Sequence, residues 1–148
     1  PYGDIVPMTA ECPTLTFNTI GRHQSRLVRT RVASNLSPWL AKTEVGDMHT
    51  IAISHGEGRF VASDDMLAQL KANGQIATQY VDEAGVPGMD LSVNPNGSLL
   101  AIEGITSPDG RVFGKMGHSE RYSNGTFKNV PGEKDQPLFA AGVEYFTA

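Results

Sequence analysis

An imidazole and a carboxylate stand two residues apart in the run Gly114–Arg121, at His118 and Glu120. The run directly follows the strand-like segment 110–113. Side chains at i and i+2 of an extended strand project to one face, so a strand that continued through the run would set Glu120 beside His118. In a nucleophilic triad a carboxylate fixes the tautomer of an imidazole, and the imidazole deprotonates a thiol or hydroxyl. The pair is therefore a candidate base and orienting acid, although a His-x-Glu sequence alone is more often a solvated turn.

Composition and charge narrow the function classes. The chain has 148 residues, of which 39% are hydrophobic, and this suits one compact domain with its own core. A net charge of -4 and dispersed Lys and Arg argue against nucleic-acid binding. No apolar run approaches the roughly 20 residues of a membrane span, so we expect no membrane association. A single cysteine gives no internal disulfide, which is typical of a reducing compartment and predicts a cytoplasmic protein.

Alternating and β-branched runs predict a strand-rich chain that can position these residues. In the first run Val28, Thr30 and Val32 share one face, and Arg29 and Arg31 lie on the other, as in a half-buried strand. A turn at 107–110 is expected to join the last two strands as a hairpin. The five predicted strands cover residues 27–32, 50–54, 75–81, 99–105 and 111–116.

Two segments are predicted to be helical. Ser63 can cap a helix that carries acidic residues in its first turn and stops at Asn73-Gly74. The second helix is expected over 136–146, where apolar residues recur at helical spacing. Its apolar stripe consists of Leu138, Phe139, Val143 and Phe146.

Four ordered motifs carry a resemblance to a known family. They are Ser54–Phe60, Asn94–Ser98, Ala101–Thr106 and Met116–Arg121. In that order they resemble the glutamine amidotransferase domain of phosphoribosylformylglycinamidine synthase. The similarity extends from about residue 15 to residue 146, and four motifs in order are far more specific than one.

The resemblance implies an α/β fold. Residues 1–148 would be the C-terminal, strand-rich portion of a class I glutamine amidotransferase domain, flavodoxin-like and with a mixed sheet. On this interpretation the chain is a partial domain that lacks its N-terminal, nucleophile-bearing half.

The resemblance also implies an activity. The family domain is a triad-type glutaminase in which a cysteine attacks the glutamine side-chain amide, and His118 and Glu120 match its catalytic His and Glu. Ammonia then passes to a synthetase part, which uses ATP and Mg²⁺; no cofactor is expected in this segment. Gly117 and Ser119 stand where relatives often have proline, and the loss of two prolines is expected to loosen the turn.

The family nucleophile is expected outside this sequence. It occupies a Gly-x-Cys-x-Gly elbow, a sharp strand-to-helix turn with small neighbours. Cys12 is preceded by Glu11 and followed by Pro13, and a residue before proline is pushed toward extended backbone. We therefore predict that Cys12 is not the nucleophile, that the chain starts just after the elbow, and that this segment alone is inactive.

The motif around residue 57 supplies further candidates. His55, Gly56, Glu57 and Arg59 are predicted to bind substrate as a wall of the active-site cleft, or to contact the synthetase part, because the glycines permit close backbone approach and His55 and Arg59 offer donors. The competing interpretation is a strand-ending turn with solvated charges. No metal site is predicted, because no ligand-like spacing joins the histidines.

The expected partners are glutamine, the synthetase part and the missing half of the glutaminase domain. A severed sheet would expose a strand edge, so a homo-oligomer through that edge is also expected. Two alternatives stay open. One is a non-catalytic, strand-rich binding module, and the other is part of a free-standing amidotransferase subunit of the same pathway.

Overall fold

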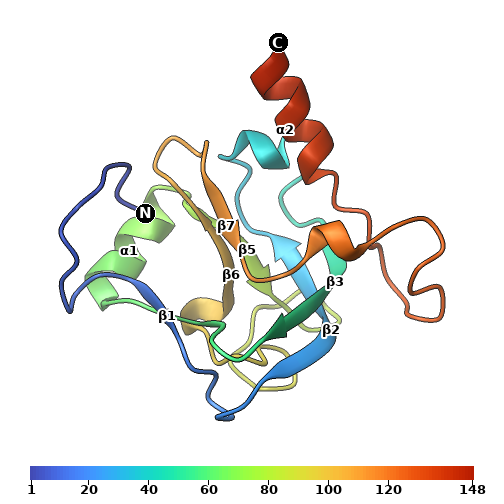
Figure 1. Ribbon diagram of the computed structural model, residues 1–148, viewed down its shortest axis with the longest axis horizontal. Coiled ribbons are helices and arrows are strands. Elements are labelled where there is room, and N and C mark those ends of the chain that lie inside the picture. Colours follow the sequence, from blue (N-terminus) through green and yellow to red (C-terminus); the bar gives the residue numbers. More distant parts are fainter.

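Five strands form the main sheet of the protein, and two shorter strands form a second one (Figure 1). The computed structural model describes residues 1–148. The main sheet has the order β3-β2-β5-β6-β7, and β1 pairs with β4. The strands are β1 (Thr14–Thr16), β2 (Gln24–Val32), β3 (Met48–His55), β4 (Arg59–Val61), β5 (Ile76–Tyr80), β6 (Ile102–Thr106) and β7 (Phe113–Lys115). The helices are α1 (Asp64–Ala72) and α2 (Leu138–Thr147), with 3-10 turns η1 (Pro38–Leu40), η2 (Leu99–Ala101) and η3 (Ser119–Arg121).

Every strand pair is antiparallel, whereas the expected sheet is mixed. A short connection explains the difference for β6 and β7. Residues 107–112 join β6 to β7, and a parallel pair would need a crossover of a dozen or more residues. The hairpin turn is as predicted: Gly110 N donates to Ser107 O, and Gly110 adopts a φ of 73° that favours glycine.

The five predicted strands are present, with the largest changes in bounds at β6 and β7, and β1 and β4 were not predicted. In β2 the alternation holds, because Val28, Thr30 and Val32 are all buried. The strand predicted from residue 99 begins only at Ile102. Leu100 and Ala101 have φ values of 52° and 55°, and these left-handed conformations interrupt an extended segment.

The first helix matches its local signals. Ser63 accepts a hydrogen bond from Met66 N at 3.3 Å, and the helix ends at Asn73. The second helix forms as predicted, but its stripe is wrong. Leu138 is buried, whereas the other three residues of the stripe are exposed; Ala141 and Gly142 are buried instead, because α2 packs on Trp39 through its small residues. The helix projects from the body of the protein to the C-terminus (Figure 1).

Three hydrophobic clusters hold the sheet together. One joins α1 to the sheet, a second fills the middle of the sheet, and a third lies under η1 and the start of α2. Their buried members are Phe60, Leu67, Leu70, Ile76 and Ile102; Val28, Ile53, Tyr80 and Ala101; and Val32, Leu40, Ala77 and Leu138. The clusters fix the positions of β3, β6 and β7, from which the candidate site is built.

Candidate active site

His118 lies just beyond β7, where the chain turns back over the sheet. Its backbone N–H donates to Ala52 O of β3 at 2.8 Å, and this bridge holds the segment against the sheet. The strand ends at Lys115, so His118 and Glu120 do not share the face of a continuing strand. Instead, η3 brings Glu120 back toward His118.

The two side chains meet in a hydrogen bond. His118 Nδ1 donates to Glu120 Oε1 at 2.6 Å, and the side chains are 31% and 55% exposed. Burial raises the pKa of Glu120, but the hydrogen bond from His118 opposes this and the net effect lowers it. Nε2 of His118 makes no hydrogen bond within the chain. This is the arrangement of an imidazole that a carboxylate orients and that can take a proton at Nε2.

A pocket of about 430 Å³ adjoins the pair. His118 and Glu120 line it, together with apolar residues from η1, β7 and α2. The apolar members are Trp39, Phe113, Leu138 and Phe139, joined by Met116. The pocket thus combines an acid–base pair with apolar side chains, as small-molecule sites commonly do.

The predicted substrate-binding residues occupy the turn between β3 and β4. Both ring nitrogens of His55 are buried and make no hydrogen bond of normal geometry. Burial lowers the pKa of His55, and the nearby Asn96 side chain opposes that shift. His55 ends the strand whose Ala52 forms a bridge with His118. Glu57 is exposed and makes no hydrogen bond or ion pair, and Arg59 is half-buried in β4. Whether any of them binds substrate stays a prediction.

Glycine is required in this turn at Gly58. A Cβ there would lie 2.2 Å from Cδ2 of His55, so the imidazole packs directly on the backbone. Asn18 ties the turn together, because its side chain donates to His55 O and accepts from Gly58 N, both at 2.9 Å. Gly56 lies near the backbone of His23.

Residues 94–98 form hydrogen bonds to the turn between β3 and β4. Asn94, Asn96 and Ser98 are fully buried. Ser98 Oγ donates to Gly58 O at 3.2 Å and accepts from the backbone N–H of residue 60 at 3.1 Å. Asn96 Nδ2 donates to Tyr80 Oη at 2.8 Å. The motif is therefore structural, and it holds the His55 turn.

Cys12 lies in the N-terminal arm and makes only local contacts. Its thiol donates to Pro7 O at 3.8 Å and accepts from Thr9 N at 3.4 Å. The hydrogen bonds with the backbone and side chain of Thr9 lower its pKa. None of its hydrogen bonds involves an imidazole, so no histidine is placed to act as its general base.

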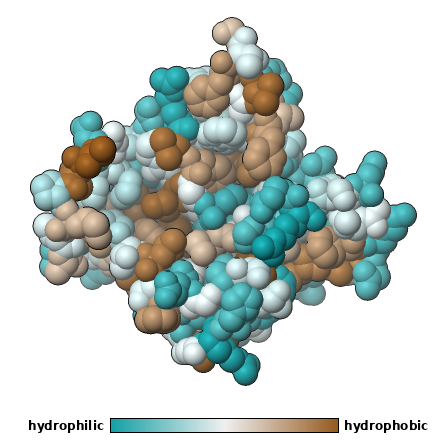
Figure 2. All heavy atoms as spheres, in the orientation of Figure 1, coloured by the Kyte–Doolittle hydropathy of each residue, from teal (hydrophilic) through white to brown (hydrophobic).

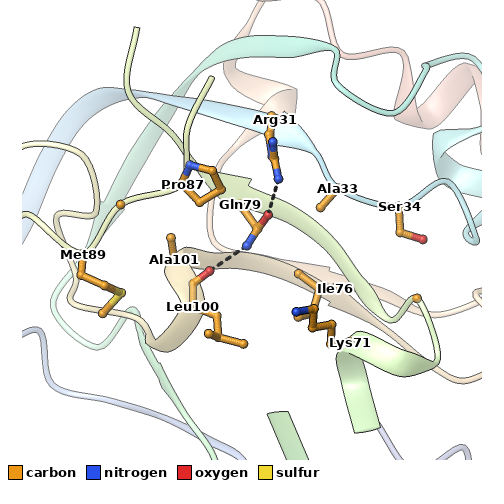
Figure 3. A pocket seen from close by; sticks show the side chains of 12 residues that line it. Arg31, Ala33, Ser34, Lys71, Ile76, Gln79, Pro87, Met89, Leu100 and Ala101 are labelled. Carbon is orange, nitrogen blue, oxygen red and sulfur yellow. Dashed lines mark hydrogen bonds between the residues drawn. The ribbon is translucent and has the colours of Figure 1, made fainter. Parts of the chain in front are cut away.

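A larger pocket, of about 510 Å³, lies elsewhere, between β2, β5 and η2 (Figure 3). Arg31 donates to Gln79 Oε1 at 3.2 Å, and Gln79 donates to Leu100 O at 2.8 Å. The residues that line this larger pocket include no histidine, cysteine or carboxylate, and none of the candidate residues. Size alone therefore does not make it the reactive site.

Two further features bear on function. No group of three or more His, Cys, Asp or Glu side chains is placed so that it could hold a metal ion. None of the helices combines the length and apolar character that crossing a membrane requires.

Comparison with known proteins identifies the family. The sequence matches the model of the CobB/CobQ-like glutamine amidotransferase domain over residues 1–146. The chain belongs to this family. The resemblance inferred from the four motifs is confirmed.

Relatives extend this result. The phosphoribosylformylglycinamidine synthase subunit PurQ of Thermomicrobium roseum is 40% identical over 91 residues, which are 62% of this chain and 38% of that protein. The PurQ subunit of Methanosarcina mazei is 34% identical over 133 residues, 90% of this chain and 55% of that protein. The chain thus spans about half the length of these relatives.

A solved structure supports the fold. A chain in the structure of PurLQS from Thermotoga maritima superimposes with a TM-score of 0.66 and 28% identity, covering 91% of this chain and 53% of that one. The predicted class, an α/β fold of the class I glutamine amidotransferase type, is confirmed.

Sequence reasoning missed two residues beneath the site. Glu103 and Lys115 form a buried ion pair with Nζ and Oε1 3.7 Å apart. Glu103 lies in one of the four motifs and Lys115 directly precedes another, but no rule of sequence spacing relates the two residues. Only the pairing of β6 with β7 brings them together.

Proposed function

We propose that this chain supplies the general base and the orienting acid of the glutaminase part of phosphoribosylformylglycinamidine synthase. The observation that carries the proposal is the 2.6 Å hydrogen bond from His118 Nδ1 to Glu120 Oε1 beside a pocket. Membership of the amidotransferase family and similarity to PurQ subunits support it. The enzyme would use glutamine-derived ammonia to convert formylglycinamide ribonucleotide to its amidine in purine biosynthesis.

In this reaction the nucleophile is a cysteine from a segment outside residues 1–148. Its thiol gives a proton to Nε2 of His118, and the sulfur attacks the side-chain carbonyl carbon of glutamine. Glu120 accepts from Nδ1–H, which leaves Nε2 as the proton acceptor and stabilises the imidazolium. The imidazolium then protonates the leaving amine, ammonia departs, and a thioester remains.

Water completes the cycle. His118 takes a proton from the attacking water, glutamate is released, and the thiol is regenerated. Ammonia passes to the synthetase part, where ATP and Mg²⁺ would act; neither has a role in the steps that this chain performs. Residues 55, 56, 57 and 59 are proposed to form a wall of the glutamine site.

An apolar surface suggests where the rest of the domain packs. Leu15 is 49% exposed and lines a hollow with Ile105 and Met116, and Val112 of the β6–β7 hairpin is 69% exposed. Figure 2 shows hydrophobic residues gathered over the part of this face where β6 and β7 lie. We propose that the nucleophile-bearing half covers this surface, and that without it the chain self-associates.

The glutaminase proposal is tested by complementation. The purified chain should form no glutamate from glutamine, whereas the chain combined with a segment that carries a Gly-x-Cys-x-Gly elbow should do so. His118→Ala should abolish this turnover, and Cys12→Ser should leave it unchanged. Turnover by the chain alone that Cys12→Ser removes would refute the proposal, and an inactive complemented protein would favour a binding module.

Sedimentation tests the covered surface. The chain alone should form oligomers, and addition of the complementing segment should dissociate them, because that segment covers the apolar surface through which the chains associate. A chain that stays monomeric at all concentrations would contradict the proposed packing surface.

A further inference from the structure

A buried carboxylate lies beneath the segment that holds His118. Glu103 of β6 is 2% exposed. Its oxygens accept from Thr78 Oγ1 of β5 and from Gly117 N, the latter at 2.6 Å. Burying a carboxylate costs free energy unless donors surround it. None of these contacts takes part in the proposed reaction, so the position of Glu103 calls for another explanation.

Lys115 connects this carboxylate to the site. Its Nζ lies 3.7 Å from Glu103 Oε1 and donates to Ser119 Oγ and to Gln136 Oε1, both at 2.8 Å. Burial lowers the pKa of Lys115, and Glu103 opposes that shift. The Ser119 hydroxyl in turn donates to Gln136 Oε1 at 2.7 Å. A continuous polar network thus runs from the centre of the sheet to the residue between His118 and Glu120.

The network holds His118 from both sides. Gly117 N is bonded to Glu103, and the Ser119 side chain is bonded to Lys115. Between them, His118 N is bonded to the backbone of β3. Three consecutive residues are therefore fixed, and η3, which carries Glu120, begins at the third of them.

Gly117 is part of the same arrangement. A Cβ there would lie 2.8 Å from Glu103 Oε1 and 2.9 Å from Ile51 Cγ2. A proline at 117 would have no N–H for Glu103, and a proline at 119 would have no hydroxyl for Lys115. Hydrogen bonds therefore supply here the restraint that proline rings could otherwise provide, and the expected loosening of the turn is compensated.

We propose that Lys115 and Glu103 are a positioning pair, which keeps His118 and Glu120 in hydrogen-bonding register. Neither residue touches the reacting atoms. The expected effect of the pair on turnover rests on the proposed glutaminase function, whereas its effect on the tautomer of His118 can be measured without that function.

The first measurement is the tautomer of His118, read from ¹⁵N NMR of the ring in the 148-residue chain. With the pair intact, the neutral ring should carry its proton on Nδ1, facing Glu120. Lys115→Met should produce a mixture with the Nε2–H form, because Ser119 loses its hydrogen bond from Lys115 and keeps only the one to Gln136. Lys42→Met is the matched control, because it removes the same charge from the exposed Lys42–Glu144 ion pair. It should leave the tautomer unchanged.

A second variant guards against unfolding. Lys115→Met alone leaves a buried carboxylate without its cation, which is strongly destabilising. Lys115→Met with Glu103→Gln removes both charges and should fold, yet it should still show the mixed tautomers. A folded double variant with a pure Nδ1–H ring would overturn the proposal.

The second measurement uses the complemented enzyme. The double variant should lower kcat by up to about 100-fold and change KM little, as expected when a reacting group is misplaced. Unchanged kcat would overturn the positioning role. If the wild-type complemented protein has no glutaminase activity, the proposed function fails, and the tautomer result alone decides the role of the pair.

Discussion

Gly142→Ala should destabilise the chain, although alanine is the better helix former. Gly142 lies in the middle of α2, on the buried face. Helix propensity alone predicts a gain of about 1 kcal/mol from the substitution. However, the new Cβ would lie 2.3 Å from Cζ3 and 2.5 Å from Cε3 of Trp39. The helix and the indole must separate by about 1 Å to reach ordinary contact.

The indole cannot move aside freely. Trp39 Nε1 donates to Arg111 O at 2.8 Å, and its ring lies 5.6 Å from that of Phe146. Overpacking of this kind costs about 1–3 kcal/mol, which exceeds the propensity gain through most of that range. We expect a net loss of about 1 kcal/mol and a Tm about 2–4 °C lower.

Thermal unfolding followed by circular dichroism measures the effect. In a Trp39→Leu background the clash is removed, so Gly142→Ala should raise Tm there; this reversal of sign is the matched control. A higher Tm for Gly142→Ala in the otherwise unchanged chain would refute the reasoning. The test also concerns the site, because Trp39 and the start of α2 line the His118 pocket.

Three further outcomes are expected. Leu40→Ala should lower the free energy of unfolding by about 2–5 kcal/mol in urea titrations, because Leu40 is fully buried, whereas exposed Val45→Ala should change it by less than about 0.5. Burial lowers the pKa of His55 below its usual 6.5, so the folded state binds a proton at His55 less readily than the unfolded state does. The free energy of unfolding therefore keeps its full contribution from His55 above pH 6.5 and loses it as the pH falls below that value. The urea midpoint should therefore fall between about pH 7.5 and pH 5.5, and less so in His55→Asn. Burial raises the pKa of Glu120, but the bond from His118 lowers it below 4.5 overall, so ¹³C NMR should show Glu120 titrating below that value and His118→Ala should move its midpoint upward.

Local signals predicted most of the fold. The alternation in β2 and the Ser63 cap of α1 depend on near neighbours, and both are present in the structure. Predictions failed where contacts between residues far apart in the sequence decide which face of an element is buried. The apolar stripe of α2 faces outward, because the small face around Gly142 fits Trp39 more closely.

The candidate site shows the same division. The types and spacing of His118 and Glu120 predicted their pairing, but not the 3-10 turn that achieves it. Periodicity could not reveal Glu103 beneath them, because it is twelve residues from Lys115 and only the β6–β7 ladder sets the two side by side. The burial of both His55 ring nitrogens depends likewise on packing against Gly58.

The two pairs of the site have opposite physical characters. His118 and Glu120 are partly exposed, and a side-chain pair in contact with water contributes about 0–1 kcal/mol and holds its geometry weakly. Glu103 and Lys115 are almost fully buried, where a pair stabilises little but allows few alternative arrangements. An exposed pair that must stay oriented for proton transfer therefore gains its order from the buried pair below. On the side of Glu120 the connection is the hydroxyl of Ser119, which accepts from Lys115, so Ser119→Ala should loosen the exposed pair while leaving the buried one intact.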